Sequence, residues 1–213
     1  MTNATYGKLT AGLIGAWFIV SLTASALHVF NGDPSRPPLA VGLAVVIPIA
    51  LFLLWFAISK EFRLFALGLN PRTLTLIHTW RTVGFTFLVL ATYGILPSFF
   101  ALPAGWGDIA IGATAPFAAL MLANPSRRGL FVLWQALGIL DLLLAVGLGT
   151  AARLIEPHGI TTNAMSVLPM SLIPTFAVPL LLILHIICIA QARQWPVQSY
   201  SGIREQIPSP ATR

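Results

Sequence analysis

The chain alternates long apolar stretches with short polar breaks. A helix needs about 20 mostly apolar residues to cross a bilayer. Six stretches meet that length, at about residues 9–30, 39–59, 73–96, 104–124, 128–151 and 167–192. The breaks between them contain proline, glycine, asparagine and charged residues, which end helices. The pattern predicts an all-α membrane protein, in which residues 1–195 form a bundle of six transmembrane helices and residues 196–213 a polar cytoplasmic tail.

The break between the second and third stretches differs from the others. It runs from Lys60 to Arg72 and mixes charged with aromatic and aliphatic residues. This mixture is typical of a short amphipathic helix that lies on a membrane surface. We therefore expect a short interfacial segment between helices 2 and 3.

Lysine and arginine are unevenly divided between the two sides of the predicted bundle. Six spans place both termini on one side, and only Arg36 and Arg153 lie on the other. The basic residues on the side of the termini are Lys8, Lys60, Arg63, Arg72, Arg127, Arg128, Arg193, Arg204 and Arg213. Cytoplasmic loops carry the excess of basic residues. The distribution predicts an integral membrane protein with both termini cytoplasmic, in the cytoplasmic (inner) membrane if the source is bacterial. Ala24-Ser25-Ala26 leaves open a cleaved first span.

Composition supports the membrane assignment and excludes several classes of protein. The chain is 57% hydrophobic and 8% charged, with a mean hydropathy of +0.86, whereas soluble domains contain about 25% charged residues. The net charge of +6 comes from loops beside apolar stretches, so the expected partner is the lipid bilayer and not nucleic acid. The single cysteine, Cys188, excludes an intrachain disulfide and a CxxC site. In span count and orientation, the chain is similar in outline to substrate-binding subunits of energy-coupling vitamin transporters.

Three charged residues stand inside the apolar stretches: Arg81, Asp108 and Asp141. A charge at the bilayer centre costs at least about 2.5–3.5 kcal/mol and usually marks a functional site. Helix geometry places Arg81 about 12 Å from the inner boundary, Asp141 about 18 Å and Asp108 about 24 Å. An Arg81–Asp141 pair is expected if their helices are neighbours, either as part of a binding site or as a device that fixes helix packing. Asp108 follows Pro103, and one interpretation makes it a cap in the first turn of its helix.

Other polar and aromatic residues complete the predicted site. Trp80-Arg-Thr-Val-Gly84 and Trp134-Gln-Ala-Leu-Gly138 share a pattern that indicates either a weak internal repeat or chance. Gln135 lies on the same helix side as Asp141, at helical spacing. The predicted substrate-binding residues are therefore Arg81, Asp108, Asp141, Gln135, Trp80 and Trp134, between the third, fourth and fifth spans. Small residues on helix faces also suggest close contact with other helices, within the chain or in a homo- or hetero-oligomer.

His78 and His185 offer a redox alternative. Both are expected about 8–12 Å from the inner boundary, on different helices. Two histidines at matching depth can ligate one haem b iron axially. No CxxCH or HExxH sequence is present, and the residues indicate no metal site beyond these two candidate haem ligands.

Four functions remain open from the sequence. The first is a small permease or solute-binding membrane subunit for a small molecule or ion, in which Arg81 attracts an anionic group and Asp141 carries a proton. The second is a membrane-embedded enzyme that acts on a lipid or isoprenoid-like substrate, with Asp108 and Asp141 as acid and base. The third is a b-type haem protein, and the fourth is a structural or assembly subunit. Whether the chain is an enzyme stays undecided at this stage.

Overall fold

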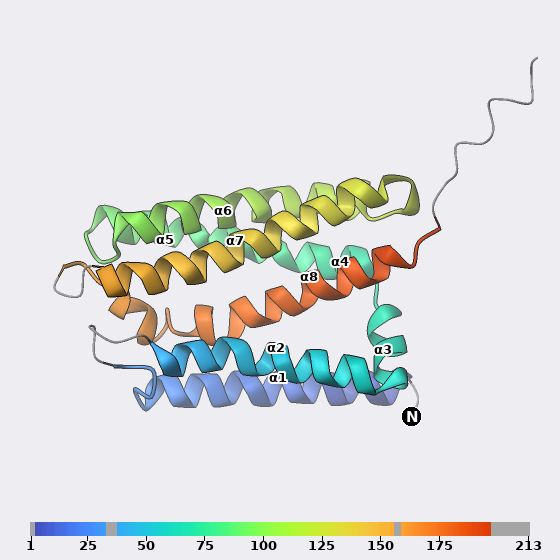
Figure 1. Cartoon of the computed structure of the whole chain (residues 1–213), viewed down its shortest axis with the longest axis horizontal. Helices are drawn as coiled ribbons and strands as arrows, with labels where there is room; N and C mark the ends of the chain where they lie inside the picture. The colour runs from blue at the N-terminus through green and yellow to red at the C-terminus, as the bar shows by residue number, and fades with distance from the viewer. Residues whose placement is uncertain (1–2, 33–37, 156–158, 197–213) are drawn as a thin grey trace, which may run out of the picture.

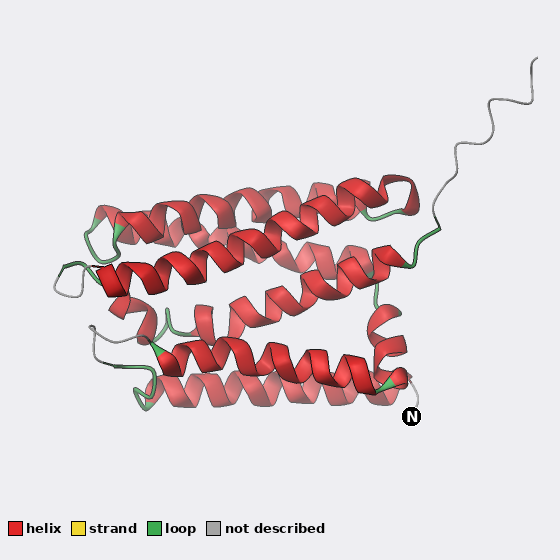
Figure 2. Cartoon of the chain, in the orientation of Figure 1, coloured by secondary structure: helices red, strands yellow, loops and turns green. Residues whose placement is uncertain are grey.

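The computed structural model describes residues 3–32, 38–155 and 159–196, without the side chains of residues 153–155. These residues form helices joined by turns, with no strand among them (Figure 2). The long helices run side by side along one axis (Figure 1). The all-α prediction is therefore confirmed for the part of the chain that the structure describes.

Six helical segments are long and apolar enough to span a membrane. They are Ala4–Ala26, Leu39–Ile58, Pro71–Thr92, Ser98–Leu122, Pro125–Ala152 and Ile173–Arg193. Each overlaps one stretch predicted from hydropathy, so the six predicted long apolar helices are confirmed among the described residues. The fourth begins earlier than expected because its helix continues through Pro103. Proline is tolerated inside transmembrane helices, where neighbouring groups satisfy the backbone that it leaves unpaired.

Several spans are composed of more than one element. The first two spans are α1 (Asn3–Ala26) and α2 (Leu39–Ile58), each a single helix. The remaining elements, in chain order, are α3 (Lys60–Leu67), α4 (Pro71–Ile77), η1 (His78–Gly84), α5 (Phe85–Thr92), α6 (Ser98–Phe117), η2 (Ala118–Leu122), η3 (Pro125–Arg127), α7 (Arg128–Ile155), η4 (Thr162–Ser166), η5 (Ile173–Ala177) and α8 (Val178–Arg193). The third span is thus divided by the 3₁₀ segment η1, and the fourth and sixth contain the π-helical segments η2 and η5.

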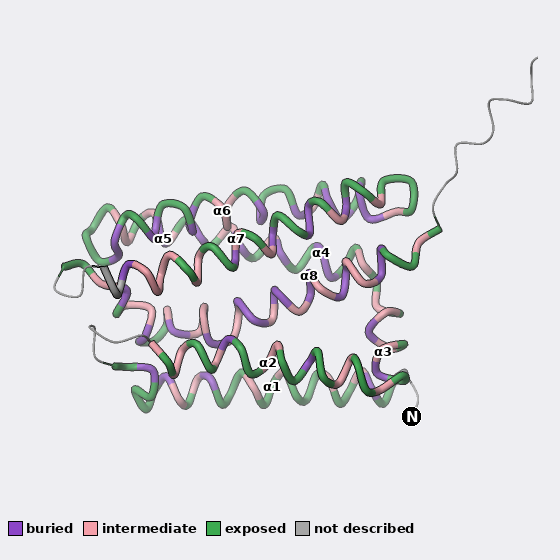
Figure 3. The backbone as a smooth tube through the Cα atoms, viewed as in Figure 1, coloured by how far each residue is buried: buried purple, intermediate pink, exposed green. Residues whose placement is uncertain are grey.

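The bundle has two parts joined by α8. The segment α4–η1–α5 packs closely on α6, and α6 packs on α7. The helices α1 and α2 lie on the opposite side, and α8 runs between the two parts in contact with α2 and α7 (Figure 1). Both α1 and α2 expose many large apolar side chains, whereas α8 is largely buried (Figure 3). An apolar exposed surface of this kind is expected where helices face lipid.

The start of the sixth span is irregular because of two prolines. Pro179 cannot donate a hydrogen bond to the carbonyl of Thr175, which lies one turn earlier. Ser21 Oγ on α1 lies 3.4 Å from that carbonyl oxygen and donates to it. Pro174 likewise frees the carbonyl of Met170, which accepts from the backbone N–H of Ile173 at 3.0 Å. The freed backbone groups therefore find partners, one of them on α1.

The predicted short segment after the second span is the helix α3, at one end of the bundle (Figure 1). Phe62 and Ala66 form its buried side. The buried side-chain amide of Gln191 on α8 donates to the carbonyls of Ala66, Leu67 and Leu69 at 3.2, 3.3 and 2.8 Å. This amide ties the end of α3 and the following turn to α8.

The first helix begins and the last helix ends at the same end of the bundle (Figure 1). An even number of spans requires this arrangement. Lys8, Lys60 and Arg193 belong to the helix ends on the side of the termini. The proposed tail lies outside the described residues beyond Pro196, as does Arg36. The orientation of the bundle in a membrane stays a prediction from the basic residues.

Candidate functional site

In the structure, the carboxylates of Asp108 and Asp141 both bind the guanidinium of Arg81. Arg81 Nε donates to Asp108 Oδ1 at 2.7 Å, and Arg81 Nη2 donates to Asp141 Oδ2. Arg81 Nη1 donates to the carbonyl oxygen of Gly138 at 3.2 Å. All nitrogens of the guanidinium are thus engaged. The predicted Arg81–Asp141 pair is confirmed, and Asp108 joins it.

The 3₁₀ geometry of η1 directs Arg81 into the bundle. A 3₁₀ helix has three residues per turn, so residues i, i+3 and i+6 lie on one side. His78, Arg81 and Gly84 have this spacing and are all buried. The side chain of Arg81 is only 1% exposed. The local change of helix type therefore aligns an imidazole, a guanidinium and a bare glycine on the face that meets α6 and α7.

Two glycines allow the carboxylates to approach. A Cβ atom on Gly84 would overlap the side chain of Asp108, and a Cβ atom on Gly107 would overlap the carboxylate of Asp141. Any side chain at either position would push its carboxylate away from Arg81. These glycines were not predicted as site residues. The sequence does hold a signal for them: Gly84 follows Arg81 by three residues, and Gly107 directly precedes Asp108, both inside otherwise apolar spans.

The interpretation of Asp108 as a helix cap is wrong. The helix α6 begins at Ser98, so Asp108 lies ten residues inside it, about 15 Å along the axis. The error came from taking Pro103 as a helix boundary. Asp108 is therefore also closer to the level of Arg81 and Asp141 than the sequence predicted, and it has no local capping role.

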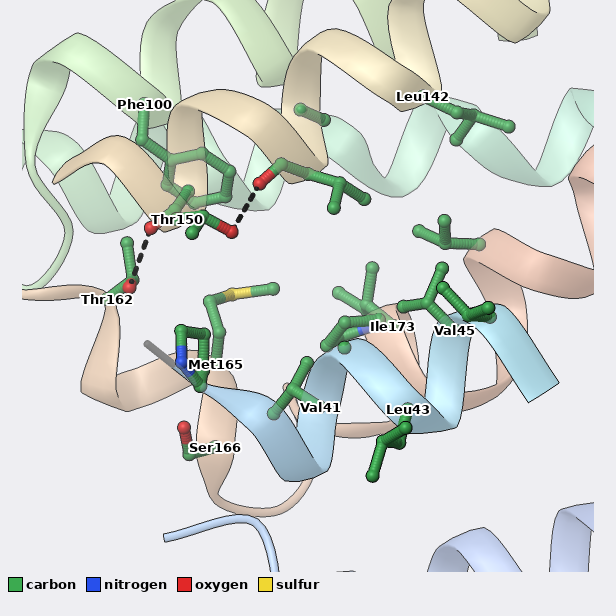
Figure 4. A pocket seen from close by; sticks show the side chains of 18 of the residues that line it. Val41, Leu43, Val45, Phe100, Leu142, Thr150, Thr162, Met165, Ser166 and Ile173 are labelled. Atoms are coloured by element: carbon green, nitrogen blue, oxygen red, sulfur yellow. Dashed lines mark hydrogen bonds between the residues drawn. The ribbon is translucent and has the colours of Figure 1, made fainter. Parts of the chain in front are cut away.

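A largely apolar cavity of about 410 Å³ has Asp108 among its lining residues. Figure 4 shows side chains that line it, among them Val41, Phe100 and Leu142. Its walls come from α2, α5, α6, α7 and the segment from η4 to α8. Representative wall residues are Val41, Phe100, Leu142 and Met165. The hydroxyl groups in the wall are already bonded: Thr150 donates to the carbonyl of Val146 at 2.9 Å and Thr162 to that of Gly149 at 3.1 Å. Asp108 is the one charged residue among those that line this space.

One side of the cavity is open. Leu39, Leu43 and Val46 on α2 line it, and they are 73%, 57% and 60% exposed. Residues that line a cavity and stay this exposed mark an opening and not a closed wall. The opening therefore lies along α2, which is long and apolar enough to span a membrane.

A second group of buried polar residues lies on the other side of Gly138. His185 Nδ1 donates to Gln135 Oε1, and Gln135 Nε2 donates to Thr75 Oγ1 at 3.1 Å. A Cβ atom on Gly138 would overlap the ring of His185. Gln135 and His185 are fully buried. Gly138 therefore separates this network from Arg81, with its Cα toward His185 and its carbonyl toward the guanidinium.

The two buried histidines do not fit a haem site. Their rings are stacked, with centroids 3.8 Å apart and planes inclined by 21°. Axial ligands hold the iron between them, so the porphyrin would have to separate the two rings. Direct stacking leaves no room for it. Within the described residues, no group of three or more His, Cys, Asp or Glu side chains could hold a metal ion.

The two predicted tryptophans have different positions. Trp134 is buried, donates from Nε1 to Thr114 Oγ1 at 3.0 Å, and packs against the rings of His78 and His185. Trp80 is 65% exposed, so the structure does not bring it into the polar core with Arg81. It precedes Arg81 by one residue, and adjacent residues of a 3₁₀ helix point about 120° apart. The apparent repeat therefore does not place equivalent residues in equivalent surroundings.

The small-residue face of α6 is used within the chain. Gly112 packs against the backbone of Thr82, where a Cβ atom would stand 2.5 Å from its nitrogen. Ala115 and Ala119, which continue the stripe, are fully buried. The close approach of α6 and η1 at these positions holds Asp108 beside Arg81. This face is consequently not available for contact with another chain.

Comparison with known proteins assigns the chain to a family. Neither the curated proteins nor the solved structures contain a match to it. The sequence model of one family, described as Domain of unknown function (DUF8737), matches residues 37–193. The match contains Arg81, Asp108, Asp141 and the cavity, whereas α1 lies outside it. Since it covers more than half of the sequence, the chain belongs to the DUF8737 family.

Proposed function

We propose that this protein is a permease or solute-binding membrane subunit that holds a largely apolar small molecule in the cavity beside Asp108. The observation that carries the proposal is the meeting of an apolar cavity with a charged centre inside the membrane-spanning part. Binding sites for small molecules are typically apolar spaces with a few placed polar groups that fix orientation. The polar site would lie between the third, fourth and fifth spans.

The geometry changes one part of the sequence-based hypothesis. Arg81 was expected to attract an anionic group, but its three nitrogens are occupied by Asp108, Asp141 and the carbonyl of Gly138. The charged residue that lines the cavity is Asp108. The site therefore favours a ligand that is apolar over most of its surface and does not need Arg81.

The positive-inside distribution supports both termini on the cytoplasmic side. On that orientation the cavity lies toward the outer half of the membrane, since it includes η4 and the first turns of α2. A reporter enzyme that is active only outside the cytoplasm, fused after Arg213, should stay inactive. Activity at that position would reverse the proposed orientation.

Filling the cavity tests the proposed binding site. Gly42 lines it, and a Cβ atom there meets no atom within 4 Å, so Gly42→Phe should place a ring in the cavity without disturbing the backbone. Gly147→Phe is the matched control, because Gly147 also has open space beside it and is not one of the α7 residues that line the cavity. The probe is a neutral alkyl benzophenone, photo-crosslinked to purified protein in nanodiscs. Saturable labelling should be lost in Gly42→Phe and kept in Gly147→Phe. Equal saturable labelling of both variants would contradict the proposal.

A second candidate function is an enzyme that acts on a lipid or isoprenoid-like substrate. The opening along α2 favours it, because such a substrate would arrive from the bilayer. Against it, both carboxylates are bound to the same guanidinium, and Asp108 is the one that borders the cavity. An acid and a base need separate environments around the substrate. Incubation of nanodiscs with membrane lipid extract, followed by mass spectrometry, should show no new product that depends on Asp108; such a product would favour the enzyme.

A further inference from the structure

The charged centre carries more negative than positive charge. It contains two carboxylates, Asp108 and Asp141, and both of their salt bridges go to the single guanidinium of Arg81. The other titratable side chains that face it are His78, one 3₁₀ turn before Arg81, and His185, which lies against Gly138. In the part of the chain that the structure describes, no second Lys or Arg is paired with these carboxylates.

The excess charge lies at the wall of the cavity. The side chain of Asp108 is 16% exposed and lines the cavity, whereas that of Arg81 is 1% exposed. Asp141 is similarly 17% exposed. The other lining residues are mostly aliphatic or aromatic, so water and counter-ions are largely excluded there. An unpaired carboxylate in such surroundings is strongly disfavoured, and it is relieved either by a proton or by a cation.

We propose that the cavity binds one lipophilic cation, such as a quaternary ammonium or phosphonium ion with apolar substituents, in exchange for one proton held by the Asp108–Asp141 pair. This inference rests on the proposed function, because it names the class of ligand that the same cavity takes. The apolar substituents occupy the aliphatic walls, and the positive centre lies next to Asp108.

The exchange conserves charge and atoms. Without the cation, one carboxylate oxygen of the pair carries an O–H bond, and the centre with Arg81 is neutral. When the cation binds, that O–H bond breaks, the electron pair stays on the carboxylate and the proton passes to water. Loss of the proton leaves the centre with one negative charge, which the bound cation balances. Both carboxylates share Arg81, so the single excess negative charge belongs to the pair. Either the proton or the cation can neutralise it, and the two need not bind the same oxygen atom.

Two ions of the same shape and opposite charge test the class of ligand. Tetraphenylphosphonium and tetraphenylborate differ in the sign of their charge while keeping four phenyl groups. Purified protein in nanodiscs should bind radiolabelled tetraphenylphosphonium saturably, at least about tenfold more tightly than tetraphenylborate, which corresponds to about 1.4 kcal/mol. Asp108→Asn should remove this preference. Equal affinity for the two ions in the wild-type protein would overturn the inference.

Proton release tests the exchange. In weakly buffered solution with a pH indicator, addition of tetraphenylphosphonium to the wild-type protein should release about one proton per bound cation. Asp141→Asn should release none, because its centre is already neutral without a proton. Release that persists in Asp141→Asn but is lost in His185→Gln would place the proton on the imidazole and overturn its assignment to the carboxylates. Binding without release would overturn the exchange.

The outcomes separate this inference from the proposed function. If Gly42→Phe does not affect labelling by the neutral benzophenone and neither tetraphenyl ion binds, the proposed function fails. If the neutral probe labels the cavity but the two ions bind equally, only the inference about charge fails. The wild-type measurements decide the inference even where Asp108→Asn or Asp141→Asn does not fold, since charge preference and proton release are measured without a variant.

Discussion

Replacement of Arg81 by leucine should strongly destabilise the bundle. The change removes two ion pairs and the donor to the carbonyl of Gly138, and it leaves Asp108 and Asp141 facing each other. Removal of one partner from a buried ion pair typically costs about 3–5 kcal/mol. The carboxylate side chains are still 16% and 17% exposed, so partial contact with solvent can offset some of the repulsion between them. We therefore expect the free energy of unfolding to fall by about 3 kcal/mol.

The same reasoning predicts a rescue. In Arg81→Leu with Asp108→Asn and Asp141→Asn, no charge remains to be compensated, and replacement of a whole buried charged group by neutral residues is often close to neutral. The triple variant should therefore return to within about 1 kcal/mol of the wild-type protein. Arg72→Leu is a suitable control, because Arg72 is on the surface of α4 and surface substitutions usually change stability by about 0.5 kcal/mol or less.

The assay uses the single cysteine of the chain. Cys188 is fully buried on α8, so its modification by a fluorogenic maleimide reports opening of the bundle. Titration with SDS from mixed micelles then gives the free energy of unfolding for each variant. The reasoning is refuted if Arg81→Leu is no less stable than Arg72→Leu, or if the triple variant is as unstable as Arg81→Leu alone.

Further predictions concern packing. Gly138→Ala should destabilise the protein by about 1–3 kcal/mol, since its methyl group would overlap the ring of His185. Gly147→Ala has open space beside it and should instead stabilise the protein by about 0.5–1 kcal/mol. Equal effects of the two substitutions in the SDS titration would argue against the close packing at Gly138. Ser21→Ala should cost about 1 kcal/mol in the same titration, because the carbonyl of Thr175 loses its donor, and no change would show that water replaces it. In the wild-type protein in mild detergent, Cys188 should resist maleimide until denaturant is added, and rapid reaction would contradict its burial.

The spans were predictable because the signal for each is an average over about 20 residues. Single residues such as Pro103 change the ends of a span but not its existence, and the fourth helix shows this. Depth showed that Arg81 and Asp141 could pair if their helices were neighbours, since rise per residue fixes the level of each side chain once the span is placed. The third member, Asp108, was misplaced because its level depends on where the helix begins.

Features that depend on local helix geometry were not accessible from the sequence. An α-helical third span does not place His78, Arg81 and Gly84 on one line, whereas the 3₁₀ segment does. Trp80, next to Arg81 in the chain, is 65% exposed. The stacking of His78 on His185 depends on the approach of α8 to η1, which depth alone does not reveal.

The cavity left no signal in the sequence that periodicity could detect. Its walls come from helices far apart in the chain, and residues such as Val41, Leu142 and Met165 are ordinary apolar residues of a membrane protein. A cavity arises where the packing of several helices leaves space, which is a property of their arrangement and not of any one segment. Only Asp108, as a charge inside a span, marked the position of its polar end.

The most direct test of the central claim is protection of a cysteine placed in the cavity. In a Cys188→Ala background, Val41→Cys puts a thiol in the cavity wall, and Leu13→Cys puts one on the exposed face of α1 as a control. Both are treated with a membrane-permeant maleimide in nanodiscs, with and without tetraphenylphosphonium. The account predicts that the cation slows modification of Val41→Cys and leaves that of Leu13→Cys unchanged. Equal rates with and without the cation at Val41→Cys would contradict a cation-binding cavity beside Asp108.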